Sequence, residues 1–215
     1  MDHGAAIGRS LSVALMLATG GLAMPVLAQE AGYTPGEFSV DPAGAATYQV
    51  PLSVPPGAAG MQPELALLYH SRAGNGQLGV GWSLSGLSAI SRCPAIRDSE
   101  GVARSDGVTL SSSDRFCLDG QLLRHQSGTY GANGVRYFTE VQSFQEVFSY
   151  GVTNGAPTRF EVTDRAGLKR IYGQTTDSRI TSVGDTASVP IIWALNRIED
   201  KLGNYITFSY GRDAR

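Results

Sequence analysis

Short apolar segments separated by turn residues follow one another along the chain from residue 46 onward. Several alternate apolar and polar positions with a period of two, which is the pattern of a half-buried β-strand. The runs at 47–50 (TYQV) and 205–210 (YITFSY) are the clearest, and both are rich in β-branched and aromatic residues. The pattern predicts strands at Ala46–Val54, Leu65–Tyr69, Ser83–Ile90, Arg115–Arg124, Tyr137–Val141, Glu146–Tyr150, Arg159–Val162, Leu168–Tyr172, Ile191–Ile198 and Tyr205–Tyr210.

The segments between these strands carry turn signals. Asp-Gly occurs at 106–107 and 119–120, and Asn-Gly occurs at 75–76, 133–134 and 154–155. These dipeptides accept the positive φ angles that tight hairpins need. No twelve-residue window shows the apolar stripe of a helix. The sequence therefore predicts an all-β chain of antiparallel hairpins and short strands.

A weak internal repeat appears in the last third of the chain. Asp164 to Gly167 and Asp200 to Gly203 both have the form Asp-x-x-Gly, and an aromatic residue follows each glycine five positions later. Each copy predicts a strand, a turn and a second strand. Because a single hairpin is barely stable in water, the copies must pack on neighbouring strands.

The first 28 residues have the pattern of a secretory signal peptide. A short n-region with Arg9 precedes the apolar stretch Leu11–Leu22, which is too short to span a bilayer. Small or β-branched residues then precede a cleavage site after Ala28. A buried N-terminal helix is disfavoured because Gly20 and Pro25 would weaken and stop it. We expect an exported mature chain without a membrane span, secreted or periplasmic and cell-surface, that begins with a linker or edge segment at 29–45.

Composition narrows the class of protein further. The 27 glycines and 10 prolines in 215 residues favour a turn-rich β protein over a helical bundle. The formal net charge is −2 and the pI is about 5.9, so no positive field exists to attract nucleic acid. Nucleic acid is therefore excluded as a partner. The sequence has 2 cysteines and 3 histidines, which are few ligands for a structural zinc site. We expect neither a metal nor a cofactor.

Cys93 and Cys117 are the two cysteines of the sequence. Export to an oxidising compartment favours a structural disulfide between them. Two free buried thiols and a reactive or metal-binding pair are the alternatives. No histidine or acidic cluster adjoins the pair to complete a zinc site.

The remaining candidate binding and catalytic residues are explained by turn or surface positions. The run 74–79 (GNGQLG) matches G-x-G-x-x-G, but no helix-forming segment follows to hold a pyrophosphate, so we expect a glycine-rich turn. His70 and His125 are interpreted as surface or partly buried polar residues, because the sequence has no Gly-x-Ser-x-Gly elbow. A mixed, solvated surface loop accounts for the charged residues Arg92, Arg97, Asp98, Glu100, Arg104, Asp106, Asp114 and Arg115.

Several segments together resemble a known family. They are 36–41 (GEFSVD), 43–52 (AGAATYQVPL), 63–69 (PELALLY), 71–84 (SRAGNGQLGVGWSL), 91–94 (SRCP), 115–120 (RFCLDG) and 193–198 (WALNRI). They resemble the SpvB-type N-terminal domain, which begins the B components of insecticidal toxin complexes and many bacterial Rhs/YD-repeat proteins. The resemblance covers residues 36 to 211, with Rhs-like strands from about residue 159.

The resemblance implies a β-rich shell that encloses a toxic C-terminal region, with this domain as non-catalytic wall. Family members continue for many more strands beyond the point that matches Arg215, so we expect a fragment or a loss of the full shell. Some relatives carry a C-terminal ADP-ribosyltransferase, and the lack of a Glu-x-Glu pair argues that this enzyme is not in the chain. The residues expected to matter are structural, namely Trp82 and Trp193 in the core, Cys93 and Cys117, and Gly76, Gly79 and Gly81 at a turn.

The partners implied are downstream strands of the same polypeptide or a companion toxin subunit. An adhesion or interaction module that binds through an exposed sheet edge is the alternative function. A small secreted hydrolase is a more remote one.

Overall fold

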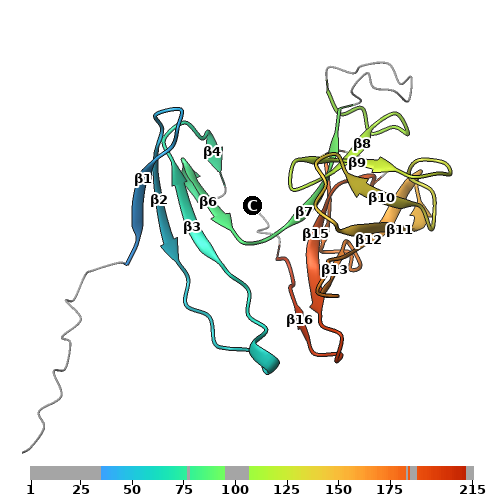
Figure 1. Cartoon of the computed structure of the whole chain (residues 1–215). Coiled ribbons are helices and arrows are strands. Elements are labelled where there is room, and N and C mark those ends of the chain that lie inside the picture. The colour runs from blue at the N-terminus through green and yellow to red at the C-terminus, as the bar shows by residue number, and fades with distance from the viewer. Residues whose placement is uncertain (1–34, 77, 95–106, 183, 185–187, 212–215) are drawn as a thin grey trace, which may run out of the picture. The chain divides into compact units, whose positions relative to one another are not determined.

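The computed structural model describes residues 35–76, 78–94, 107–182, 184 and 188–211, and the chain there is built of strands (Figure 1). Its one helical element in those ranges is a single 3-10 turn, η1, at Ala58–Gly60. The all-β prediction is confirmed. The strands are β1 (Glu37–Val40), β2 (Ala46–Pro51), β3 (Ala66–His70), β4 (Asn75–Gly76), β5 (Gly79–Val80), β6 (Trp82–Ser85), β7 (Ala89–Cys93), β8 (Arg115–Leu118), β9 (Gln121–His125), β10 (Arg136–Thr139), β11 (Glu146–Thr153), β12 (Ala156–Thr163), β13 (Lys169–Tyr172), β14 (Arg179–Thr181), β15 (Pro190–Glu199) and β16 (Tyr205–Thr207).

The first sheet has four antiparallel strands in the order β1-β2-β3-β6, which lie side by side in Figure 1. The two-residue strands β4 and β5 form a small hairpin of their own between β3 and β6 in the sequence. This sheet is a single layer with very few buried residues, of which Ala45 and Ala66 are examples.

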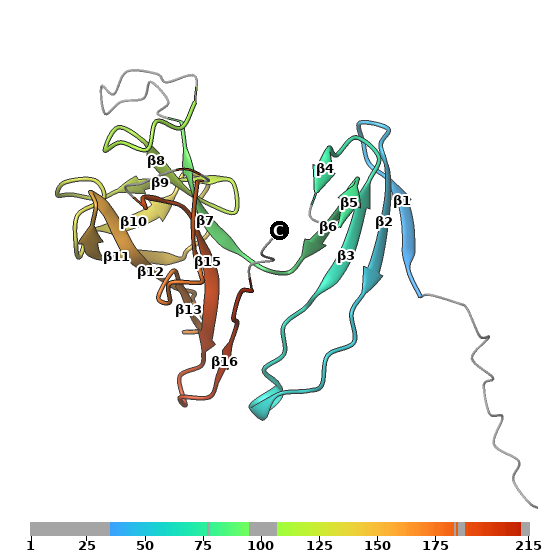
Figure 2. The same ribbon diagram turned by 180° about the vertical axis from the view of Figure 1, so that it is seen from behind.

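The second sheet contains the other ten strands, and its pairings close on themselves. Strands β7 to β13 pair each with the next, and the ten-residue β15 pairs with both β7 and β13. Strands β14 and β16 also pair with β15, and Figure 2 shows β16 beside β15. Closure leaves no free edge among the eight strands of this ring.

The hydrophobic core lies inside this ring. Three aromatic side chains meet there, since the ring centroids of Phe116, Phe160 and Trp193 are 5.1 to 5.3 Å apart and the planes are steeply inclined. Such edge-to-face packing is the favoured geometry for aromatic pairs. Each indole or phenyl group is almost completely buried, and aliphatic residues from most of the strands surround them.

Three turns of the form Asp-x-x-Gly share one hydrogen-bond pattern. They begin at Asp41, Asp164 and Asp200 and join β1 to β2, β12 to β13 and β15 to β16. In each, the aspartate carbonyl accepts a bond from the glycine N–H, at 2.9, 2.9 and 3.2 Å. The aspartate Oδ1 accepts another from the residue after the glycine, at 2.8, 3.0 and 2.9 Å. The glycine φ angles are 81°, 81° and 86°, which favours glycine there. The sequence pattern predicted the second and third turns but not the first.

Two predicted strands are each broken in two. The segment Ser83–Ile90 divides into β6 and β7 at Gly86, which has a φ of 92° and lies against the backbone of Glu64. The segment Arg115–Arg124 divides into β8 and β9 at a hairpin whose Asp119 and Gly120 both have positive φ. Strand β1 lies inside the segment 29–45 that was predicted as a linker or edge, and β14 was not predicted.

The prediction of a solvated charged loop is wrong for three of its residues. Arg92, Asp114 and Arg115 are all buried. Arg92 and Asp114 are on or beside strands of the closed ring, and their charges are matched by a direct ion pair. Residues 95–106, which hold Asp98, Glu100 and Asp106, lie outside the described residues, as does the predicted cleavage site after Ala28.

Among the helices in the described ranges, none has the length and apolar character required to cross a membrane.

Candidate interaction surface

A row of aromatic side chains crosses the four-stranded sheet from edge to edge. Phe38 pairs with Tyr48, Tyr48 with Tyr69, and Tyr69 with Trp82, one from each strand. Directly opposed residues project from the same face of a sheet, so all four rings lie on one side. The rings of Tyr69 and Trp82 are in contact, with centroids 5.4 Å apart.

The positions two residues away along each strand make the same face apolar throughout. Val40 lies beside this row on β1, and Val50, Leu67 and Leu84 form a second cross-strand row. We call the eight residues Phe38, Val40, Tyr48, Val50, Leu67, Tyr69, Trp82 and Leu84 the apolar face.

The opposite face of the sheet is mostly polar. Ser39 and Thr47 share a hydrogen bond of 2.6 Å there, and Ser83 and Ser85 each donate to backbone of β3. Polar and apolar side chains thus alternate along the strands, as in an antiparallel sheet with one solvated face and one face that packs on a core.

The apolar face is open in this structure. The exposed fractions of Phe38, Val40 and Leu84 are 68%, 59% and 42%, and the other five residues are half-buried. An apolar patch that crosses four strands is larger than the scattered apolar residues of an ordinary surface, and such patches mark interaction sites. This face is the strongest candidate functional surface among the described residues.

The predicted glycine turn lies next to this face. Gly76 and Gly79 pair across the β4–β5 hairpin, and β6 follows, so the loop does not open a helix. A Cβ on Gly81 would lie 2.5 Å from the Tyr69 ring, and one on Gly76 would lie 2.5 Å from the Trp82 carbonyl oxygen. Gly79 has a φ of 107°, which is a backbone conformation that other residues rarely adopt. At each of these three positions a side chain would clash with a neighbour or strain the backbone, so glycine is favoured there.

The two tryptophans have different surroundings. Trp193 is completely buried, and its Nε1 donates a 2.9 Å hydrogen bond to the carbonyl of Pro157. Trp82 was expected in the core, but it is only half-buried and lies on the apolar face. The difference arises because Trp82 belongs to a single-layer sheet, whereas Trp193 points into a closed ring of strands.

Cys93 and Cys117 are joined by a disulfide between the paired strands β7 and β8, with Cα atoms 6.0 Å apart. Leu122 packs with both in a small buried cluster. Of the interpretations left open by the sequence, the structure contains the disulfide.

His70 is engaged at both ring nitrogens. Its Nε2 lies 3.1 Å from Asp41 Oδ2, and its Nδ1 accepts a 3.2 Å hydrogen bond from the N–H of Arg72. The backbone N–H of Ala45, and then the imidazole of His70, hold the pKa of the Asp41 carboxyl below its usual value. Neither nitrogen of His70 is therefore placed to accept a proton from a serine, as a hydrolytic triad requires. The ring of His125 packs at a right angle to Tyr130.

Comparison with known proteins identifies relatives for most of the chain. The family model described as "SpvB: Salmonella virulence plasmid 65kDa B protein" matches residues 40–215. A mono(ADP-ribosyl)transferase SpvB from Salmonella typhimurium (strain 14028s / SGSC 2262) is 30% identical over 183 residues, which is 79% of this chain and 30% of that protein. The relative from Salmonella choleraesuis (strain SC-B67) is also 30% identical, with the same coverage. The chain thus spans about a third of the length of these relatives.

Solved structures with the same fold are also found. The N-terminal domain of the effector protein SpvB from Salmonella typhimurium strain LT2 matches 77% of this chain and 56% of that one, with 26% identity and a TM-score of 0.56. A crystal structure of TcdB2-TccC3 matches 84% of this chain and 9% of that one, with 22% identity and a TM-score of 0.64.

Proposed function

This chain belongs to the family of the Salmonella virulence plasmid 65kDa B protein, and we propose on that premise that it is a non-catalytic wall segment of a secreted, virulence-associated shell. In this proposal the shell is of the Rhs or toxin-complex type and encloses a toxic C-terminal cargo. The wall is completed by downstream strands of the same polypeptide or by a companion toxin subunit.

The observation that carries the proposal is the open apolar face. A four-stranded sheet whose aromatic and aliphatic side chains remain exposed is half of a two-layer structure, because sheets are stable when such a face is buried against another layer. Burying Phe38, Val40 and Leu84 alone would each contribute about 1–2 kcal/mol from the apolar area removed from water. The match covers only 9% of the TcdB2-TccC3 chain. This supports the proposal that a layer of strands outside this chain covers the apolar face.

A structural role is supported by how the buried polar side chains are used. Asp114 accepts hydrogen bonds from the backbone and the hydroxyl of Thr109, both at 2.8 Å, in addition to its pairing with Arg92. Asn196 and Ser178 hold neighbouring backbone N–H groups. These groups stabilise strands and turns and are not directed at a common reaction centre.

Secretion is part of the proposal. The signal-peptide pattern of residues 1–28 and the Cys93–Cys117 disulfide are both typical of an exported protein.

Within the described residues no strand pairs with the outer edge of β1, which favours a second candidate function, a surface module that binds a partner by strand addition. Strand β1 pairs on one side with β2, and its four residues are all exposed. An unpaired edge is a template for a further strand. In this alternative the partner is another protein, and no downstream chain is needed.

The gene sequence beyond codon 215 is the first test of the shell proposal. We expect the reading frame to continue with strands that carry Asp-x-x-Gly turns and a following aromatic. A stop codon at that position would contradict the shell and favour the surface module.

The second test is capture of the downstream polypeptide, expressed separately, by this chain. The variant Leu84→Lys places a charge on the apolar face and should abolish capture. Leu202→Lys is the matched control, because Leu202 is exposed in the β15–β16 turn of the second sheet and is not part of the apolar face. Equal capture by the two variants would contradict a shell closed over the apolar face.

A further inference from the structure

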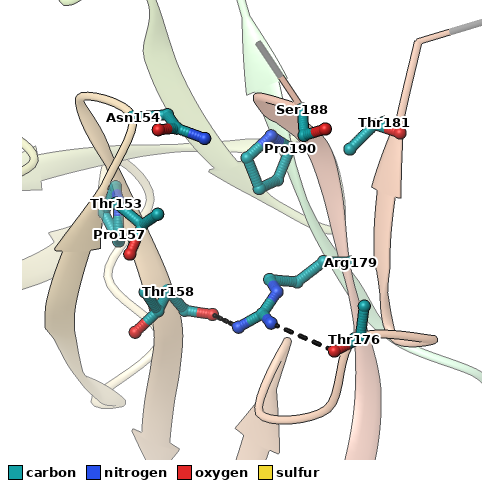
Figure 3. A pocket seen from close by; sticks show the side chains of 9 residues that line it. All are labelled: Thr153, Asn154, Pro157, Thr158, Thr176, Arg179, Thr181, Ser188 and Pro190. Carbon is teal, nitrogen blue, oxygen red and sulfur yellow. Dashed lines mark hydrogen bonds between the residues drawn. The ribbon is translucent and has the colours of Figure 1, made fainter. Parts of the chain in front are cut away.

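A pocket of about 390 Å³ with a mixed polar and apolar lining opens beside the β11–β12 turn, between that turn and the β14–β15 segment (Figure 3). Its volume is at the lower end of the range for small-molecule sites. Pro157 and Pro190, both buried, are among the lining residues. Hydroxyl groups of Thr153, Thr181 and Ser188 line the surrounding wall.

Arg179 supplies the charge of this pocket. Figure 3 shows its guanidinium pointing into the space between β12 and β14. The group donates long hydrogen bonds to the carbonyl oxygens of Thr158 and Gly173, at 3.4 and 3.3 Å, and one of 3.5 Å to the Thr176 hydroxyl. These acceptors are all neutral, and the bonds engage Nη1 and Nη2 and leave Nε available.

Two neighbouring arginines have carboxylate partners. Arg159 pairs with Glu161 at 3.1 Å, and Arg170 pairs with Asp164 at 3.3 Å. Within the part of the chain that the structure describes, no carboxylate forms an ion pair with Arg179. A half-buried guanidinium with neutral partners favours an anion, because charge-assisted hydrogen bonds are about twice as strong as neutral ones.

The surroundings of Arg179 select among anions. Its planar fork matches a carboxylate through two parallel hydrogen bonds. Among the lining residues it is the one cation, so a single negative charge is balanced better than the double charge of a phosphate. The side chains of Asn154 and of the threonines and serine that line the pocket can exchange hydrogen bonds with a ligand that itself has several hydroxyls.

We propose that this pocket binds an acidic sugar, a pyranose ring with a carboxylate, and that Arg179 holds the carboxylate. The inference does not depend on the shell function, because every residue of the pocket belongs to this chain. It also differs from a purely structural role for Arg179, which would be to tie the carbonyls of Thr158 and Gly173 together.

Trp193 provides a reporter at the pocket. Its indole N–H donates to the carbonyl of Pro157, which lines the pocket, and the sequence contains one other tryptophan, Trp82. In an ¹⁵N-labelled sample the two indole signals can be followed separately. Occupation of the pocket should shift the Trp193 signal and leave the Trp82 signal in place.

The experiment titrates the full chain with D-glucuronate and N-acetylneuraminate, and records the indole signals and the heat of binding. D-glucose, acetate, inorganic phosphate and a short aspartate-containing peptide serve as comparison ligands. We expect saturable binding of an acidic sugar with a dissociation constant of about 1 mM or lower, and binding of glucose about tenfold weaker or more.

Variants separate binding from structure. Arg179→Gln keeps donors for the two carbonyls but removes the charge, and it should weaken acidic-sugar binding about tenfold or more with little change in melting temperature. Arg179→Lys should restore part of the affinity, because it restores the charge without the fork. Arg159→Gln is the matched control and should bind like the unaltered chain.

Several results would overturn the proposal. These are no binding of either acidic sugar at millimolar concentration, equal binding by the Arg179→Gln variant, or tighter binding of acetate, phosphate or the acidic peptide than of both sugars. A loss of melting temperature in Arg179→Gln without any sugar-dependent signal in the unaltered chain would assign Arg179 a structural role alone.

Discussion

The guanidinium of Arg92 and the carboxylate of Asp114 lie 3.1 Å apart, and their side chains are only 3% and 0% exposed. Arg92 also donates to the carbonyls of Pro190 and Ser111, at 2.8 and 3.0 Å. Its guanidinium lies 5.8 Å from the ring centroids of both Phe116 and Trp193. The pair therefore connects the β7–β8 hairpin to β15 next to the aromatic core.

Breaking this pair should destabilise the fold strongly. Asp114→Ala leaves a buried arginine without its counter-charge, and we expect a loss of about 3–5 kcal/mol in the free energy of unfolding, measured in urea. The double variant Arg92→Met/Asp114→Leu removes both charges and should recover part of that loss. A single variant that lost less than about 1 kcal/mol would contradict a role for this pair in stability.

The two tryptophans should respond differently to truncation. Trp193→Ala empties the centre of the aromatic core and removes the bond to Pro157, so we expect a loss of about 3–5 kcal/mol. Trp82→Ala removes a half-exposed ring and should cost less than about 2 kcal/mol. Thermal unfolding of the two variants measures the difference, and equal effects would mean that Trp82 is as buried as Trp193.

Reduction of the disulfide should lower stability without changing the fold. The bond joins residues 24 apart in sequence, and loop entropy in the unfolded chain gives about 3.5 kcal/mol for a loop of this size. The Cys93→Ser/Cys117→Ser variant should show a lower urea midpoint than the oxidised chain, at the same far-ultraviolet circular dichroism. The reduced unaltered chain is the control and should unfold near the variant.

Acid should destabilise the Asp-x-x-Gly turns. The pKa of Asp200 is lowered mainly by a hydrogen bond from the side-chain amide of Asn204. The pKa of Asp41 is lowered mainly by a hydrogen bond from the backbone N–H of Ala45. A carboxyl whose pKa is depressed by folding contributes stability that is present above its unfolded value of about 3.9 and is lost as the pH falls through its folded pKa.

The variant Asp41→Asn/Asp200→Asn tests this dependence. The uncharged amides should make the urea midpoint fall less between pH 4 and pH 2 than it does in the unaltered chain. Glu64→Gln serves as the control, because Glu64 is an exposed carboxylate outside these turns. Parallel acid profiles for the turn variant and the unaltered chain would contradict the assignment.

Exposure of the apolar face should be measurable in the isolated chain. We expect binding of the fluorophore ANS, and less of it in the Phe38→Ser/Leu84→Ser variant, because that change removes two of the most exposed apolar groups of the face. Leu202→Ser removes a leucine of the other sheet that is more exposed than Leu84, and it should leave ANS fluorescence unchanged. Equal fluorescence in all three proteins would mean that the face is covered.

The sequence by itself determined most of the strands and many of the turns. Alternating apolar positions located β2 and β16, because side chains of a strand point to opposite faces with a period of two. Short apolar runs between turn residues located β3, β11 and β15. Asn-Gly located the β11–β12 hairpin, because both residues accept positive φ, whereas the Asp-Gly at 119–120 fell inside a segment predicted as one strand. These are local preferences of the chain, and they need no knowledge of distant residues.

The tertiary structure decided which residues share a face, a core or a pocket. Nothing in the local sequence distinguishes Trp82 from Trp193. Trp193 is buried because β15 pairs with both β7 and β13 and so closes the ring of strands, whereas Trp82 lies outside this ring. Register placed Phe38, Tyr48, Tyr69 and Trp82 in one row. Arg92 and Asp114 are 22 residues apart in the sequence and were expected at the surface, but the fold brings them together as a buried ion pair. Such relations depend on long-range strand pairing, where a shift of one residue moves every side chain to the opposite face.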